Sequence, residues 1–227
     1  MKKKRVIIAL LVVGIAVSLC FMRDSKKIKD ILALPTDYRT GVITSIIRDV
    51  TGVLSSANID YWAHFGTLLG SVREKGVIPH DYDVDLSILQ SDASRAVAKL
   101  KKNLVGYKIG RFKRFGFDNI TIEHPSGIGC DIALFTRKGE YIVRTIPNIV
   151  QPKNEKKGFL YTDIYPTQEV DLSLFTIRIP RKPDPVLRTL YGDSYMTPRK
   201  RNTNGWRPID LMWTGLCLCL VMINTVT

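Results

Sequence analysis

Apolar and polar residues alternate in several short segments of the chain and recur with helical spacing in others. Across residues 38–57 the apolar side chains fall three and four positions apart, which predicts a helix with one buried face. Alternation across residues 83–89 predicts a strand in which Val84, Leu86 and Ile88 share one face. The same criteria predict helices over 68–74, 91–104 and 185–191, strands over 59–65, 107–112, 116–123, 130–136, 141–145 and 170–179, and an irregular stretch over 149–165. These elements indicate an α+β fold with a mixed β-sheet flanked by helices.

Long apolar segments lie at both ends of the chain. A basic stretch, residues 2–5, precedes seventeen residues, 6–22, that carry no charge. A spanning helix typically has ~20 residues, so we predict that residues 1–24 form an uncleaved, single-pass signal-anchor in the membrane. A cleaved signal peptide is the alternative, because Ala16, Val17 and Ser18 resemble a small-residue cleavage site. The apolar tail, residues 211–227, either packs on the domain or contacts the membrane, and the sequence leaves both open.

These ends set the predicted domain organisation and cellular location. A charged linker and a lead-in helix over residues 25–57 precede the main domain, which we place at residues 58–210. Basic residues flank the anchor on both sides, so the positive-inside rule is nearly balanced. We expect the domain on the extracytoplasmic side, which would be the Golgi or ER lumen in a eukaryotic cell or for a virus in a eukaryotic host.

Composition narrows the choice of partners. The chain has a formal net charge of +13, which favours anionic partners such as nucleotides, phosphorylated glycans or an acidic membrane surface. The basic residues are spread along the chain without a zinc finger or an aromatic RNA-binding signature, so nucleic acid is not an expected partner. The four cysteines form no CxxC pair, which argues against a disulfide framework or a zinc site.

The candidate chemistry lies in residues 66–85. Asp83 and Asp85 fall on one face of their predicted strand, shortly after the glycine turn Gly66-Thr67. Carboxylate oxygens are the ligands that Mg²⁺ prefers, and backbone N–H groups at the start of a helix bind phosphate. This arrangement therefore suits a divalent metal and a phosphate ester, although two aspartates on a strand can also form an ordinary solvated face. His64 and His80 have no partner at metal-ligand spacing, so we expect structural roles for them.

Residues 61–88 resemble the signature of the LicD/fukutin family, which has the nucleotidyltransferase fold of polymerase-beta-like enzymes. The resemblance continues in the segments 129–135, 175–180 and 190–198. It implies a metal-dependent transferase that moves a phospho-alcohol or sugar phosphate, such as phosphocholine or ribitol phosphate, from a CDP-linked donor onto a glycan acceptor.

The resemblance also implies roles for individual residues. It assigns catalysis and the binding of Mg²⁺ or Mn²⁺ to Asp83, Asp85 and Asp131, of which Asp131 is either a third ligand or the acceptor of the hydroxyl proton. Residues expected beside the donor phosphates are Gly66, Thr67, Gly70, Ser71 and Arg73. Two other functions stay open at this point: transfer of the nucleotide itself to a small molecule or protein, and a catalytically silent, membrane-bound glycan-binding module.

Overall fold

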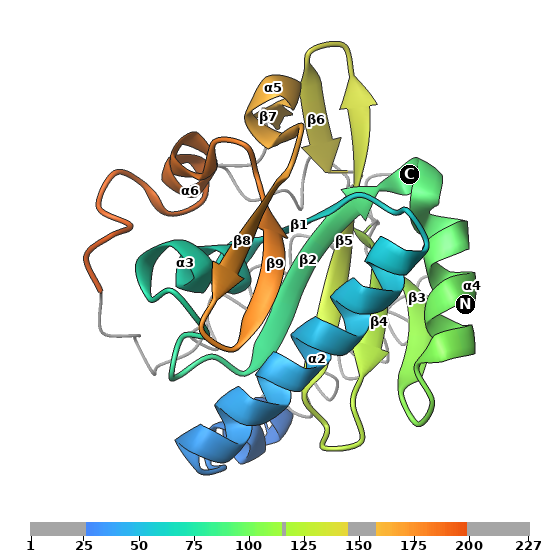
Figure 1. Cartoon of the computed structure of the whole chain (residues 1–227), viewed down its shortest axis with the longest axis vertical. Coiled ribbons are helices and arrows are strands. Elements are labelled where there is room, and N and C mark those ends of the chain that lie inside the picture. The colour runs from blue at the N-terminus through green and yellow to red at the C-terminus, as the bar shows by residue number, and fades with distance from the viewer. Residues whose placement is uncertain (1–25, 115–116, 145–157, 199–227) are drawn as a thin grey trace, which may run out of the picture. The chain divides into compact units, whose positions relative to one another are not determined.

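The helices and strands follow the predicted order. A computed structural model of the chain describes residues 26–114, 117–144 and 158–198 (Figure 1). Residues 26–32 are helical. The further helices are α2 (Thr36–Ser56), α3 (Phe65–Arg73), the 3₁₀ turn η1 (Gln90–Asp92), α4 (Ala93–Asn103), α5 (Tyr161–Ile164) and α6 (Pro183–Tyr191). The strands are β1 (Tyr61–Ala63), β2 (Asp83–Leu89), β3 (Lys108–Arg114), β4 (Phe117–Glu123), β5 (Gly129–Lys138), β6 (Tyr141–Arg144), β7 (Phe159–Leu160), β8 (Gln168–Leu172) and β9 (Phe175–Ile179).

Seven of the described strands form a mixed sheet, as predicted, and β8 and β9 form a separate two-stranded sheet. Five of the seven lie in the order β1-β2-β5-β4-β3. Strand β6 pairs with the C-terminal part of β5, and β7 pairs with β6. Strands β2 and β5 are parallel, and each of the other described pairs is antiparallel. A parallel pair needs a long crossover, which η1, α4 and the β3–β4 hairpin provide. The central strands β2 and β5 therefore both begin at the same end of the sheet.

One face of the sheet is covered by helices. In Figure 1, α2 lies in front of the sheet with α4 beside it, and the two helices contact β2 and β3. Val84, Leu86 and Ile88 on β2 are fully buried in one core with the apolar stripe of α2. Burial of this stripe, at roughly 25 cal/mol per Å² of apolar surface, is the main force holding the helices to the sheet.

The opposite face is aromatic at one end. Trp62 on β1 is the Cα partner of Ser87, and its ring lies 5.4 Å from Phe135 and 5.7 Å from Tyr165 between centroids. His64 is fully buried against Phe159 and Phe135, the packing expected of a structural residue. These rings cover the second face where β2 ends and leave its beginning, with Asp83 and Asp85, uncovered by this aromatic cluster.

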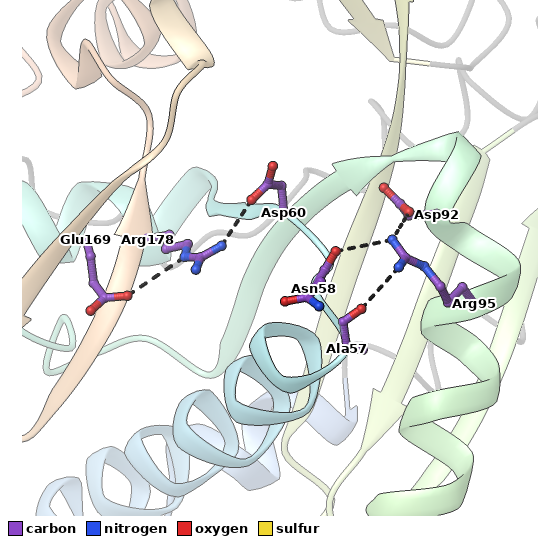
Figure 2. A network of polar contacts seen from close by, with 7 residues as sticks. All are labelled: Ala57, Asn58, Asp60, Asp92, Arg95, Glu169 and Arg178. Carbon is purple, nitrogen blue, oxygen red and sulfur yellow. Dashed lines mark hydrogen bonds and ion pairs between the residues drawn. The ribbon is translucent and has the colours of Figure 1, made fainter.

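Two arginines hold the connection between α2 and β1 (Figure 2). Arg95 of α4 donates to the carbonyl oxygens of Ala57 and Asn58 and pairs with Asp92. Arg178 of β9 pairs with Asp60 at 3.1 Å and approaches Glu169 at 3.8 Å. Arginines from two distant elements, α4 and β9, thus fix the connection that leads from α2 into β1.

Some predicted elements differ from the structure. Residues 170–179 form a hairpin, β8 and β9, and not one strand; the chain turns at Ser173 and Leu174, where no glycine or proline marks the turn. Residues 159–164, predicted irregular, form β7 and α5. The fold from Ile31 to Thr197 is one compact unit that includes α2.

The predicted membrane anchor, residues 1–24, and the apolar tail, residues 211–227, lie outside the described residues. Within the part of the chain that the structure describes, no helix is long and apolar enough to cross a membrane.

Candidate active site

Three aspartates lie on the sheet's second face, in the part that the aromatic cluster does not cover. The parallel register of β2 and β5 makes Asp85 the Cα partner of Asp131, and Asp83 precedes Asp85 by two residues on the same side of β2. The side chains of Asp83 and Asp85 are half-buried, whereas Asp131 is exposed. The residues that sequence analysis chose from two separate segments therefore lie side by side.

The start of α3 is bonded directly to Asp85. The backbone N–H of His64 donates to the Asp85 carbonyl at 3.0 Å, and the Asp85 N–H donates to the Thr67 hydroxyl at 2.8 Å. Between them, the Gly66 backbone N–H donates to the Asp85 carboxylate. Phe65 has a φ of 36°, a strained value for a bulky residue and one that tends to mark functional sites. The predicted glycine turn is thus built around the carboxylate.

The charge on Asp85 is unfavourable in its surroundings. Burial raises the pKa of this carboxyl well above its usual value, and the charges of Asp83, Asp131 and Asp81 raise the pKa further. The hydrogen bond from Gly66 lowers it in part. Crowding of carboxylates in a half-buried place is the pattern expected where a cation or a proton is to be bound.

Asp81 is held against the glycine turn. A Cβ atom on Gly66 would lie 2.6 Å from Asp81 Oδ2, so only glycine permits this approach without a shift. Asp81 Oδ1 also accepts the Tyr82 backbone N–H at 3.2 Å. Glycine at position 66 therefore serves both the turn and the close contact with the Asp81 side chain.

Several residues predicted to face donor phosphates have internal partners. Ser71 is 4% exposed and its hydroxyl donates to the Thr67 carbonyl at 2.8 Å. Arg73 pairs with Glu74 at 2.7 Å and donates to the Tyr195 carbonyl at 3.2 Å. At Gly70 a Cβ would lie 2.6 Å from the Gly76 carbonyl oxygen, which makes this a close-packing glycine. A phosphate contact from these residues stays a prediction, and their internal partners count against it.

Metal binding is likewise a prediction. Within the described ranges, no three His, Cys, Asp or Glu side chains are arranged so that they could hold a metal ion as a group. The donor set nevertheless has the right chemistry, since Asp83, Asp85 and Asp131 are hard oxygen ligands on one face and their mutual repulsion is relieved by a cation. The free thiol of Cys130 is buried in the core and faces away from this set.

Comparison with known proteins identifies the domain. Residues 58–182, more than half of the chain, match the family described as LicD/FKTN/FKRP, nucleotidyltransferase domain. The chain belongs to the LicD/FKTN/FKRP family. This confirms the resemblance found in the sequence, and the matched residues run from the start of β1 to the end of β9.

The similar curated proteins match this chain over a short stretch. The chain is 45% identical over 47 residues to an uncharacterized protein of Rickettsia prowazekii (strain Madrid E), covering 21% of this chain and 18% of that protein. It is 51% identical over 45 residues to ribitol 5-phosphate transferase FKRP of Homo sapiens, covering 20% of this chain and 9% of that protein. The matches thus span less than a fifth of the length of these relatives.

Solved structures resemble this LicD/FKTN/FKRP chain at a distance. One is ANT(2")-Ia in complex with adenylyl-2"-tobramycin, with a TM-score of 0.45, 11% identity, and coverage of 79% of this chain and 88% of that chain. Another is the lincomycin-bound lincosamide antibiotic adenylyltransferase LnuA, with a TM-score of 0.43, 15% identity, and coverage of 72% and 92%. The family assignment rests on the sequence match.

Two residues near the acidic face lie outside the matched LicD/FKTN/FKRP segment. Tyr191 ends α6 and is 39% exposed, yet Asp85, Asp81 and Asp83 are close enough that their charges, after burial, raise its pKa. Arg39 of α2 donates to the carbonyl oxygen of Asp81 at 3.0 Å. Neither residue was among the site residues predicted from the sequence, because neither belongs to the motif at residues 66–85.

Proposed function

We propose that this chain transfers a phospho-alcohol or sugar phosphate from a CDP-linked donor onto a glycan acceptor. The observation that carries the proposal is the register of β2 and β5, which brings Asp131 beside Asp85, the residue to which the turn at Gly66 is bonded. Membership of the LicD/FKTN/FKRP family supports it, as does the printed name of one relative, a ribitol 5-phosphate transferase.

The acidic face fits a divalent cation. We propose that Asp83, Asp85 and Asp131 hold Mg²⁺ or Mn²⁺, because each presents carboxylate oxygens to one side of the sheet. When bound, such an ion neutralises charge that develops on the oxygens of the transferred phosphoryl group. The raised pKa of Asp85 supports this assignment, since a nearby cation favours its ionised form.

The residues around the carboxylates position the reactants. The acceptor hydroxyl oxygen forms a bond to the phosphorus of the transferred group, the bond from that phosphorus to the bridging oxygen breaks, and CMP leaves. In the alternative to its role as a third metal ligand, Asp131, the most exposed of the three, accepts the hydroxyl proton. The first turn of α3, where Gly66 and Thr67 are bonded to Asp85, is the part of the chain best placed to meet the donor phosphates.

We further propose that residues 1–24 anchor the chain in the membrane and that the domain faces the extracytoplasmic side. Support for this part comes from the uncharged run of residues 6–22 alone. Protease protection of the full chain in sealed microsomes tests it, because an extracytoplasmic domain is protected until detergent opens the vesicles.

Product analysis tests the activity. The full-length chain, purified in detergent, is incubated with CDP-linked donors and a glycan acceptor in the presence of Mg²⁺ or Mn²⁺, and CMP release is measured. Release of pyrophosphate from nucleoside triphosphates in place of CMP would instead support transfer of the nucleotide. Absence of both products, together with no metal-dependent nucleotide binding in calorimetry, would leave a silent glycan-binding module.

A further inference from the structure

A single buried arginine connects two distant segments beside the acidic face. Arg39, on the first turn of α2, is only 4% exposed. Its guanidinium donates to the carbonyl oxygens of Pro79 at 2.7 Å and Asp81 at 3.0 Å, and to those of Leu32 at 3.2 Å and Leu34 at 2.8 Å. All four acceptors are backbone oxygens, so the arginine fixes the positions of two backbone segments and not that of a particular side chain.

The chemistry of arginine suits this task. Burying a cation is unfavourable unless its donors are satisfied, and the planar guanidinium offers five N–H groups in a fixed fork. A lysine ammonium is a compact point charge with three donors and does not reproduce that fork. Four carbonyl oxygens from two segments about forty residues apart in the chain therefore require arginine at this position.

The two carbonyls on the later segment belong to the loop 79–81, which we call the acidic loop and which leads into β2. Pro79 and Asp81 lie on either side of His80, and Asp83 starts β2 two residues after Asp81. The same loop carries the Asp81 carboxylate that touches the Gly66 turn. Any movement of residues 79–81 would therefore shift Asp81 against Gly66 and change where Asp83 leaves the loop.

We infer that Arg39 is a positioning residue for the acidic site: it fixes the loop 79–81, and through it Asp81 and Asp83, to the segment 32–34 that leads into α2. The inference rests on the proposed function for its catalytic consequence, but not for its structural one. Because both segments share one guanidinium, the chain ahead of α2 and the acidic loop are held in a fixed relation.

The test compares two conservative variants on the same helix. Arg39→Lys removes the fork, and Arg48→Lys is the matched control, because Arg48 also donates to a backbone carbonyl, that of Leu174, far from the acidic loop. Lysine keeps the charge and length, which reduces the risk that the variant does not fold. The full chain is used for both, with Arg39→Ala as a more severe variant.

Two readouts are measured. In metal-free protein, hydrogen–deuterium exchange of the backbone amides of residues 80–83 is expected to be roughly 10-fold faster in Arg39→Lys than in Arg48→Lys. In the CMP-release assay, the half-saturating Mg²⁺ concentration is expected to rise roughly 10- to 100-fold, the usual effect of losing a group that orients metal ligands.

The outcomes separate the two proposals. Unchanged exchange in residues 80–83, or faster exchange spread evenly over the fold, would overturn the positioning role, because uniformly faster exchange reports only lower overall stability. If the wild-type chain releases no CMP, the proposed function fails, and the exchange measurement alone then decides the role of Arg39.

Discussion

Asp85 and Asp131 are Cα partners on the parallel strands β2 and β5. Neighbouring strands lie about 4.8 Å apart, so two carboxylates from segments 46 positions apart in the sequence share one small region of the sheet. Like charges at this distance repel. The Gly66 N–H donates to the Asp85 carboxylate and the Asp85 N–H donates to the Thr67 hydroxyl, and these two hydrogen bonds keep the arrangement in place. A fold keeps such an unfavourable pair where a ligand uses it.

The acidic residues can be tested by isosteric substitution. Asp83→Asn, Asp85→Asn and Asp131→Asn are each expected to lower metal-dependent CMP release roughly 100-fold or more, because several kcal/mol of charge stabilisation are lost. Circular dichroism should show an unchanged fold. Asp171→Asn on β8 serves as the control, since Asp171 is exposed and its carboxylate accepts a hydrogen bond from Thr176 within the hairpin. Full activity in the first two variants would rule out the proposed site.

Asp85→Asn is also expected to make the metal-free fold more stable. The raised pKa means that the folded state holds the proton of Asp85 more tightly than the unfolded state. Its contribution to the free energy of unfolding therefore falls as the pH rises above the usual value of 3.8, and it stays low above the raised pKa. Asparagine removes the charge and keeps an oxygen for the Gly66 N–H.

The expected gain at neutral pH is about 1 kcal/mol, measured by urea denaturation in a chelating buffer. The gain should shrink as the pH is lowered toward the usual aspartate range, because wild-type Asp85 is then protonated as well. A variant that is less stable than wild type at neutral pH would contradict the assigned cause.

Gly66→Ala should impair activity more than stability. The new Cβ would lie 2.6 Å from Asp81 Oδ2, the end of a side chain that can move, so the fold can adjust while Asp81 is displaced. We expect CMP release to fall roughly 10-fold or more, as for other misplaced groups of a catalytic site. Equal activity with an unchanged melting temperature would show that Asp81 does not need its place against the turn.

Gly70→Ala should impair stability more than activity. Here the Cβ would meet the Gly76 carbonyl oxygen at 2.6 Å and Ile78 Cγ1 at 3.1 Å, and backbone cannot yield easily. Overpacking of this kind costs about 1–3 kcal/mol in the free energy of unfolding. Gly52→Ala in α2 is the control: nothing lies within 4 Å of its Cβ position, so it should stabilise the helix by about 0.5–1 kcal/mol.

Tyr165→Phe tests the aromatic end of the sheet. The Tyr165 hydroxyl is buried and has no hydrogen-bond partner among the described residues, so its removal should stabilise the fold by about 1 kcal/mol at neutral pH. Burial also raises the pKa of Tyr165 above its usual value of 10.0. Its contribution to stability therefore falls as the pH rises above that value, and the phenylalanine variant should lose less stability in alkali. Exposed Tyr141→Phe should change neither quantity.

Local pattern was sufficient for the central strand. The alternation of carboxylate and apolar side chains predicted residues 83–89, and β2 has these bounds, because a period of two reports directly on a strand with two different faces. Where the local signal was weak, the prediction was wrong: the chain turns between β8 and β9 at Ser173 and Leu174, without a glycine or proline. Contacts of the hairpin with α2 and β1 favour that turn over its local propensity.

The sequence by itself determined the family, the order of the central elements and the choice of Asp83, Asp85 and Asp131, since all of these depend on neighbouring residues and their spacing. Only the tertiary structure decided that Asp131 lies beside Asp85, that Tyr191 reaches the acidic face, and that Arg39 binds the loop 79–81. These relations join residues 40 or more positions apart along the chain. They arise from strand pairing and burial of whole faces, which local periodicity does not encode.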